Sequence, residues 1–137
     1  MESARFRGTR SFAFQLDLRS GVPVYRQLID QVLAAIASGV LRTGDRLPTV
    51  RQVAVDLAIN PNTVMRAYKE MEIRGTLTTQ QGTGTFISTR PETVDEVERG
   101  RRLTALAGEV AARAGAAGFT LDELLDRLAE MRAERAN

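Results

Sequence analysis

The chain reads LPTVRQ at residues 47–52, NPNTVMRAY at residues 60–68 and QGTGTF at residues 81–86. Thr49 and Gln52 stand three residues apart, which is the spacing of a capping box at the start of a helix. Asn60 is a favourable N-cap, and the proline after it suits the first position of another helix. The glycines of the third stretch favour the tip of a hairpin within the threonine-rich residues 76–88. These features predict the order helix, turn, helix, hairpin.

Apolar residues with helical spacing surround these signals and define the buried faces of three predicted helices. They are Tyr25, Leu28, Ile29, Val32, Leu33 and Ile36 before a C-capping Gly39, then Val50, Val53, Ala54 and Leu57, then Val64, Ala67, Tyr68 and Met71. Residues 12–18 alternate apolar and polar side chains, which predicts a short strand. Residues 12–89 are thus expected to form a winged helix-turn-helix domain, mostly α with a small β-wing. Residues 1–11 are expected to form a flexible N-terminal arm.

The helix after Asn60 is the expected recognition helix, because the start of the second helix of such a motif enters the DNA major groove. Asn62, Thr63 and Arg66 share the face opposite its apolar stripe. Asparagine pairs with adenine edges, arginine pairs with guanine, and threonine reaches a phosphate or a thymine methyl group. The alternative is a merely polar helix start, since asparagine and threonine are also common caps.

Arg51 stands at the start of the preceding helix, where the helix dipole favours anions and gives an arginine no local advantage. A DNA phosphate would supply a partner for it. The alternative is a salt bridge within the protein, to Asp56 or Glu72.

The predicted wing tip contains Gly82, Thr83 and Gly84. Backbone N–H groups and threonine hydroxyls there are suited to a phosphate or to the minor groove. A glycine-containing tip is also what any tight hairpin needs. The stretch lacks the GK[ST] sequence and the following helix of a nucleotide-binding loop, so no nucleotide site is expected.

Residues 90–137 differ in composition from the preceding domain, and they are predicted to form a two-helix dimerisation tail. The second helix begins with a Thr120/Glu123 capping box and carries the apolar stripe Leu121, Leu124, Leu125, Leu128 and Met131. Two such helices cannot bury their apolar faces alone. They pack either on the first domain or on another copy of the chain, and we favour another copy.

The charge distribution supports separate roles for the two parts. Residues 1–90 hold 12 Lys+Arg and 7 Asp+Glu, a balance of +5, whereas residues 91–137 hold 7 and 10, a balance of −3. A basic part fits a phosphate-binding face, although an ordinary solvated surface would also accommodate it. The chain has no Cys and no His, so we expect no cofactor, no transition-metal site and no disulfide. It lacks a signal pattern and a long apolar run, which predicts a cytoplasmic protein with no membrane segment.

The stretches quoted above resemble the GntR superfamily of bacterial transcription regulators over residues 12–88. The GVPVY sequence at residues 21–25 and the short helical tail look like its YtrA-like subfamily. The resemblance implies a homodimeric DNA-binding protein on a palindromic operator, usually a repressor of its own operon, often beside transporter genes. Its DNA-contacting positions correspond here to Arg51, Thr63, Arg66 and the wing glycines.

The chain departs from many relatives at four positions. Pro61 and Met65 stand where many relatives carry arginine, and Gln80 and Gln81 stand where many wings carry an arginine before the first glycine. The two glutamines argue against insertion of a wing arginine into the minor groove, and the NPNT sequence at residues 60–63 fits the YtrA-like pattern. The resemblance identifies no small-molecule effector.

Two other classes of function remain open. Related MocR-type regulators carry the same N-terminal domain ahead of an aminotransferase-like domain, but this chain has a single lysine, Lys69, in its DNA-binding part, so no enzymatic role is expected. A protein-interaction module whose basic face binds no DNA is the other class. Salt-dependent binding to duplex DNA would separate it from a regulator.

Overall fold

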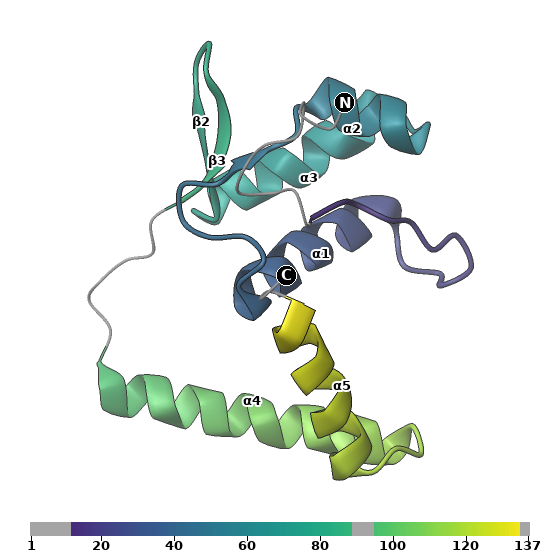
Figure 1. The fold of residues 1–137 in the computed structure, drawn as a ribbon, viewed down its shortest axis with the longest axis vertical. Helices are drawn as coiled ribbons and strands as arrows, with labels where there is room; N and C mark the ends of the chain where they lie inside the picture. The colour runs from purple at the N-terminus through teal and green to yellow at the C-terminus, as the bar shows by residue number, and fades with distance from the viewer. Residues whose placement is uncertain (1–11, 89–94, 135–137) are drawn as a thin grey trace. The chain divides into compact units, whose positions relative to one another are not determined.

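The computed structural model describes residues 12–88 and 95–134, which leaves the predicted arm at residues 1–11 outside the described residues. The chain divides into two compact units, Met1–Arg90 and Pro91–Asn137, here called the first and second unit. The described helices are α1 (Val24–Ser38), α2 (Val50–Leu57), α3 (Pro61–Ile73), α4 (Glu96–Ala116) and α5 (Leu121–Glu134), and the described strands are β1 (Arg46–Leu47), β2 (Leu77–Gln80) and β3 (Gly84–Ile87) (Figure 1). The predicted fold class, mostly α with a small β-wing, is confirmed.

The helix starts of the first unit follow the local sequence signals. The Thr49 side chain accepts a hydrogen bond from the Gln52 backbone N–H at 3.0 Å, and the Gln52 side chain accepts one from the Thr49 N–H at 2.9 Å. The Asn60 side chain caps α3 by accepting from the Asn62 N–H, with Pro61 at the first helical position. These bonds satisfy backbone donors that a helix start leaves without partners.

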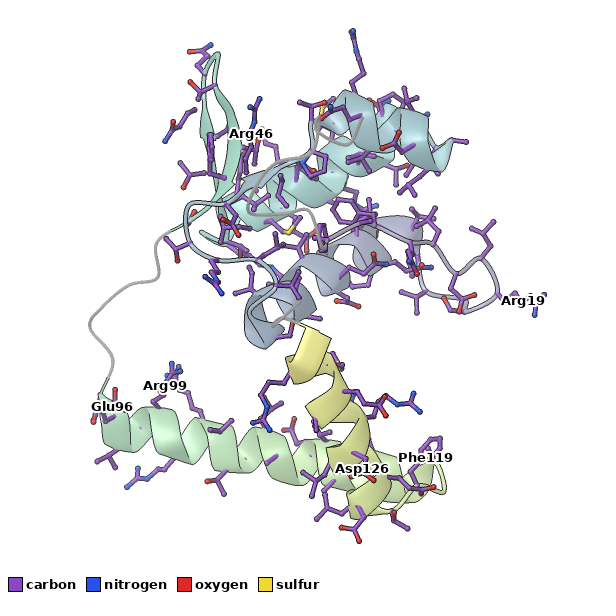
Figure 2. The ribbon with its side chains drawn as sticks, in the orientation of Figure 1. Arg19, Arg46, Glu96, Arg99, Phe119 and Asp126 are labelled. Atoms are coloured by element: carbon purple, nitrogen blue, oxygen red, sulfur yellow. The ribbon has the colours of Figure 1, made fainter. Side chains whose placement is uncertain are left out.

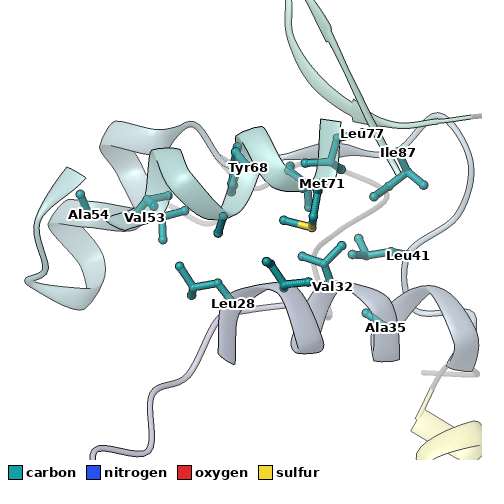
Figure 3. Close-up of a cluster of buried hydrophobic side chains, with 14 residues drawn as sticks. Leu28, Val32, Ala35, Leu41, Val53, Ala54, Tyr68, Met71, Leu77 and Ile87 are labelled. Carbon is teal, nitrogen blue, oxygen red and sulfur yellow. The ribbon is translucent and has the colours of Figure 1, made fainter. Parts of the chain in front are cut away.

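The core of the first unit lies where α3 crosses between α1 and α2 (Figure 3). Its fully buried side chains include Leu28 and Val32 from α1 and Val64 and Met71 from α3. Tyr68 is also buried, and its hydroxyl donates a 2.6 Å hydrogen bond to the Pro48 carbonyl. Burial raises the pKa of Tyr68 above its ordinary value, so the hydroxyl remains a donor and ties α3 to the residue before α2.

The wing is a three-stranded antiparallel sheet in the order β1-β3-β2. Residues 77–80 pair with residues 84–87, which confirms the predicted hairpin. The third strand, β1, was not predicted, because two residues are too short to show a periodic pattern. It places Arg46 opposite Phe86 and Leu47 opposite Thr85, and so fixes the root of the wing to the chain just before α2.

The strand predicted at residues 12–18 is wrong. The side chains of Phe12, Phe14 and Leu16 are half-buried against the core and their neighbours are exposed, so the alternation is present without a strand ladder. Side chains of α1 take the place of the ladder. The Gln31 amide bonds the backbone N–H and carbonyl of residue 15, and the Gln27 amide bonds those of residue 17.

The second unit consists of α4 and α5. The predicted Thr120/Glu123 capping box forms, with a 3.0 Å bond from the Glu123 N–H to the threonine hydroxyl and a 2.8 Å bond from the Thr120 N–H to the carboxylate. Gly118, at φ +91°, occupies the left-handed conformation in the connection between the two helices. The helix α4 runs without a break through Gly100 and Gly108, although each lowers helix propensity.

Candidate nucleic-acid interface

The exposed face of α3 is the first part of the candidate interface. Because Val64, Ala67, Tyr68 and Met71 turn inward, the opposite side of the helix faces solvent. A shallow groove of about 430 Å³ on that side is lined by Asn62, Met65, Arg66, Lys69, Glu70 and Ile73. The groove therefore offers an amide, two cations, a carboxylate and two apolar side chains on one helix face.

Two of the three predicted α3 residues lie on this groove. Asn62 and Arg66 line it, whereas Thr63 is half-buried beside the helix start and does not. Sequence reasoning did not assign Met65 and Lys69 to the site. Their spacing of three and seven residues from Asn62 was a sufficient signal, because those positions share a helix face.

Arg66 makes an aromatic contact that the sequence did not predict. Its guanidinium carbon lies 3.7 Å from the centroid of the Tyr25 ring, which comes from the first turn of α1. The sequence pattern places Tyr25 only on the apolar face of that helix. Glu70, the acidic residue of the same groove, does not pair with Arg66. Its carboxylate pairs with Arg74 at 3.1 Å and with Arg26 at 3.7 Å.

Arg51 is exposed at the second position of α2. The alternative of a salt bridge to Asp56 or Glu72 is not formed in the described chain, where the ion pairs involve other residues. The guanidinium thus sits at the positive end of a helix dipole with no carboxylate against it. That arrangement suits an external anion.

The wing tip projects beyond the helices of the first unit (Figure 1). Gln81, Gly82 and Thr83 are exposed, and the Thr83 N–H closes the turn with a 2.9 Å bond to the Gln80 carbonyl. Gly84, the third predicted wing residue, is half-buried at the start of β3. The tip residues are accessible, while Gly84 has a packing role.

That packing role involves Arg46, which lies beside the wing hairpin (Figure 2). A Cβ added to Gly84 would come within 2.8 Å of the Arg46 Nε, and its φ of +135° already disfavours other residues. Gly82 provides a matched control, because its φ is also positive, at +79°, but a Cβ there would meet no described atom within 4 Å beyond its chain neighbours.

We expect Gly84→Ala to lower the free energy of unfolding by about 1–3 kcal/mol more than Gly82→Ala does, because only the first adds a steric collision to backbone strain. Urea unfolding of both variants would measure the difference. Equal losses would show that the side chain of Arg46 moves aside without cost.

The second unit carries apolar side chains rather than a cationic face. Seven of them are between 46% and 66% exposed: Val97, Leu103, Leu106, Phe119, Leu121, Leu125 and Leu128. Of the predicted dimerisation residues, Leu124 and Met131 are half-buried, and the other three remain exposed. A groove of about 660 Å³ between α4 and α5 has Val110, Ala114 and Leu124 among its lining residues. One copy of this unit leaves much of its apolar surface open to solvent.

Neither a metal-ligand cluster nor a membrane span emerges from the described residues. Residues 12–88 and 95–134 contain no group of three His, Cys, Asp or Glu side chains that could hold a metal ion. Among the same residues, no helix is long and apolar enough to cross a membrane.

Comparison with known proteins identifies the family to which this chain is similar. The family model described as bacterial regulatory proteins, gntR family, matches residues 24–87. The HTH-type transcriptional repressor YtrA of Bacillus subtilis is 44% identical over 79 residues, which span 58% of this chain and 61% of YtrA, less than two thirds of its length. The HTH-type transcriptional regulator YhcF of the same organism is 38% identical over 79% of this chain and 88% of YhcF.

A solved structure agrees with these matches. YtrA from Sulfolobus acidocaldarius, a GntR-family transcription factor, superposes with a TM-score of 0.53 and 33% identity, covering 69% of this chain and 97% of that one. The family match, the nearly full-length similarity to YhcF and the winged fold agree with one another. The chain belongs to the gntR family of bacterial regulatory proteins, among its YtrA-like members.

Proposed function

We propose that this chain is a sequence-specific DNA-binding transcription regulator and not an enzyme. The observation that carries the proposal is the exposed face of α3, where Asn62, Arg66 and Lys69 line one groove, in a unit whose wing tip is also exposed. In the described chain, neither cation is neutralised by a carboxylate. Cations without carboxylate partners on a winged helix-turn-helix match the chemistry of a DNA backbone and of guanine edges.

The residues divide into two roles under this proposal. Arg51 and the wing tip, Gly82 and Thr83, contact phosphates and orient the protein on the duplex, and Gly84 supports the tip. Asn62, Arg66 and Thr63 supply sequence discrimination at the major groove, with adenine and guanine as the partners of the first two.

The protein acts as a homodimer in this proposal. The exposed apolar side chains of α4 and α5 support it, because a second copy of the same unit would cover them. Dimerisation sets the separation of two half-sites at about one turn of DNA, and a palindromic operator follows from the twofold symmetry.

The regulatory direction rests on family resemblance. The similar protein from Bacillus subtilis is named a transcriptional repressor. We propose repression here too, at the chain's own operon, with transporter genes among its targets. A protein that binds the chromosome acts in the cytoplasm. The proposal includes no cofactor and names no effector.

Salt-dependent binding to a duplex selected by the protein itself tests the proposed function. The purified chain is used to enrich a random duplex pool, and fluorescence anisotropy then compares the enriched duplex with a scrambled duplex. We expect the enriched duplex to bind at least about 10³-fold more tightly, and both affinities to fall steeply between about 50 and 200 mM salt. Failure to enrich any sequence, with no salt-dependent binding, would favour a protein-interaction module instead.

A further inference from the structure

We propose that Tyr25 is a positioning residue for sequence readout, and that its ring holds the Arg66 guanidinium ready to meet a guanine. This inference rests on the DNA-binding function proposed above. It concerns a residue of α1, outside the helix-turn-helix pair itself.

The ring is a fixed platform for the guanidinium. Tyr25 is half-buried and packs against the core cluster, one residue after the start of α1. α1 packs directly on α3, and the contact with Arg66 places the ring beside that part of α3. Arg66 is exposed, and its guanidinium carbon lies 3.7 Å from the ring centroid, well inside cation–π range.

The acidic neighbour that could compete for Arg66 is already paired. Glu70 stands four residues after Arg66, a spacing at which helical ion pairs form. Its carboxylate instead pairs with Arg74 at 3.1 Å and Arg26 at 3.7 Å. Within the described residues, the contact of the Arg66 guanidinium is therefore aromatic, and none of its N–H groups donates to a carboxylate.

An aromatic contact and a guanine contact use different parts of the same group. The planar guanidinium stacks on an aromatic ring through its face, whereas its N–H donors lie in the plane. A bidentate contact to guanine O6 and N7 uses those in-plane donors. A side chain ordered before binding also loses less conformational freedom in the complex. Tyr25 thus orients Arg66 for guanine recognition and leaves the N–H donors of its guanidinium available.

The test compares three single variants and one double variant of the full chain. Tyr25→Phe keeps the ring, Tyr25→Leu keeps apolar packing without a ring, and Arg66→Ala removes the guanidinium. The probes are the enriched duplex and its scrambled control. We expect Tyr25→Phe to bind like the parent, and Tyr25→Leu to weaken binding to the enriched duplex roughly two- to fivefold while leaving the scrambled duplex unchanged.

The double variant separates positioning from general damage to the fold. If Tyr25 acts through Arg66, Tyr25→Leu should cost nothing further in an Arg66→Ala background. Circular dichroism melting confirms that each variant is folded. An equal loss on both duplexes, an additive loss in the double variant, or tighter binding by Tyr25→Leu would each overturn the inference.

The outcomes also distinguish this inference from the proposed function. If the parent chain binds no duplex in a salt-dependent way, the proposed function and this inference fall together. If the parent binds and Arg66→Ala loses affinity while Tyr25→Leu does not, only the positioning role of Tyr25 is rejected.

Discussion

Truncation after Thr89 is expected to yield a folded monomer that binds the operator about 10²–10⁴-fold more weakly than the full chain does. The buried core of the first unit draws only on residues before the truncation, so the domain retains its packing. The affinity falls because two linked half-site contacts become one, and the gain from effective concentration is lost. Analytical ultracentrifugation and anisotropy titration would measure the two effects. A truncated chain that still sediments as a dimer would refute the assignment of residues 90–137.

A full-length variant tests the same interface without removing the second unit. Leu125→Glu with Leu128→Glu places two charges on the apolar face of α5, where both side chains are about half exposed. We expect this double variant to dissociate, because a dimer would have to bury those charges. Leu18→Glu is the matched control, since Leu18 is 80% exposed in the first unit and should leave the dimer intact.

Two arginine substitutions are expected to produce different kinds of loss. Arg51→Ala should weaken operator and scrambled DNA alike, and lower the salt slope by about 0.9, the value for one phosphate contact. Arg66→Ala should cost roughly 1–3 kcal/mol on the operator and little on scrambled DNA, because a base contact discriminates between sequences. The reason lies in their positions, one exposed at the start of α2 and the other on the exposed face of α3.

Binding isotherms at several salt concentrations would separate these effects. Arg19→Ala is the control for a simple loss of charge, because Arg19 lies on the turn at the other end of the first unit from the wing (Figure 2). Equal losses on both duplexes for Arg66→Ala would make Arg66 a phosphate contact. Specificity would then rest on Asn62, Thr63 and DNA shape.

The parts of the fold that sequence predicted well are those encoded by near neighbours. The capping pairs at Thr49 and Thr120 and the cap at Asn60 join residues two or three positions apart, and all three form. The hairpin tip likewise depends on a few adjacent residues. Caps and tight turns of this kind depend only on neighbouring residues, so the starts of these helices and the wing could be located without a structure.

The errors arose where the partner was distant in sequence. A period-two pattern at residues 12–18 indicates one buried face, but it does not reveal that glutamine side chains 10 and 16 residues away replace a neighbouring strand. The short strand β1 is recognisable only from its pairing with β3, about 40 residues further on.

The same reason limits what sequence says about the candidate site. Helical spacing placed Asn62 and Arg66 on the exposed face of α3, where the structure has them. The contact between Arg66 and Tyr25 spans two helices, so no local pattern reveals it. The assignment of DNA contacts and of the dimerisation residues stays a prediction until binding and sedimentation are measured.

The glutamine bonds from α1 to the segment before it are expected to give the first unit two levels of stability. Gln27 alone bonds the backbone at residues 17 and 22 and the Ser20 hydroxyl, whereas the three core helices are held by buried apolar contacts. A segment anchored by a few side-chain bonds and half-buried apolar contacts opens at lower free-energy cost than a fully buried helix does. We therefore expect residues 12–22 to form a separate opening unit, whose amide hydrogens exchange with solvent through local excursions while the helix-turn-helix stays closed.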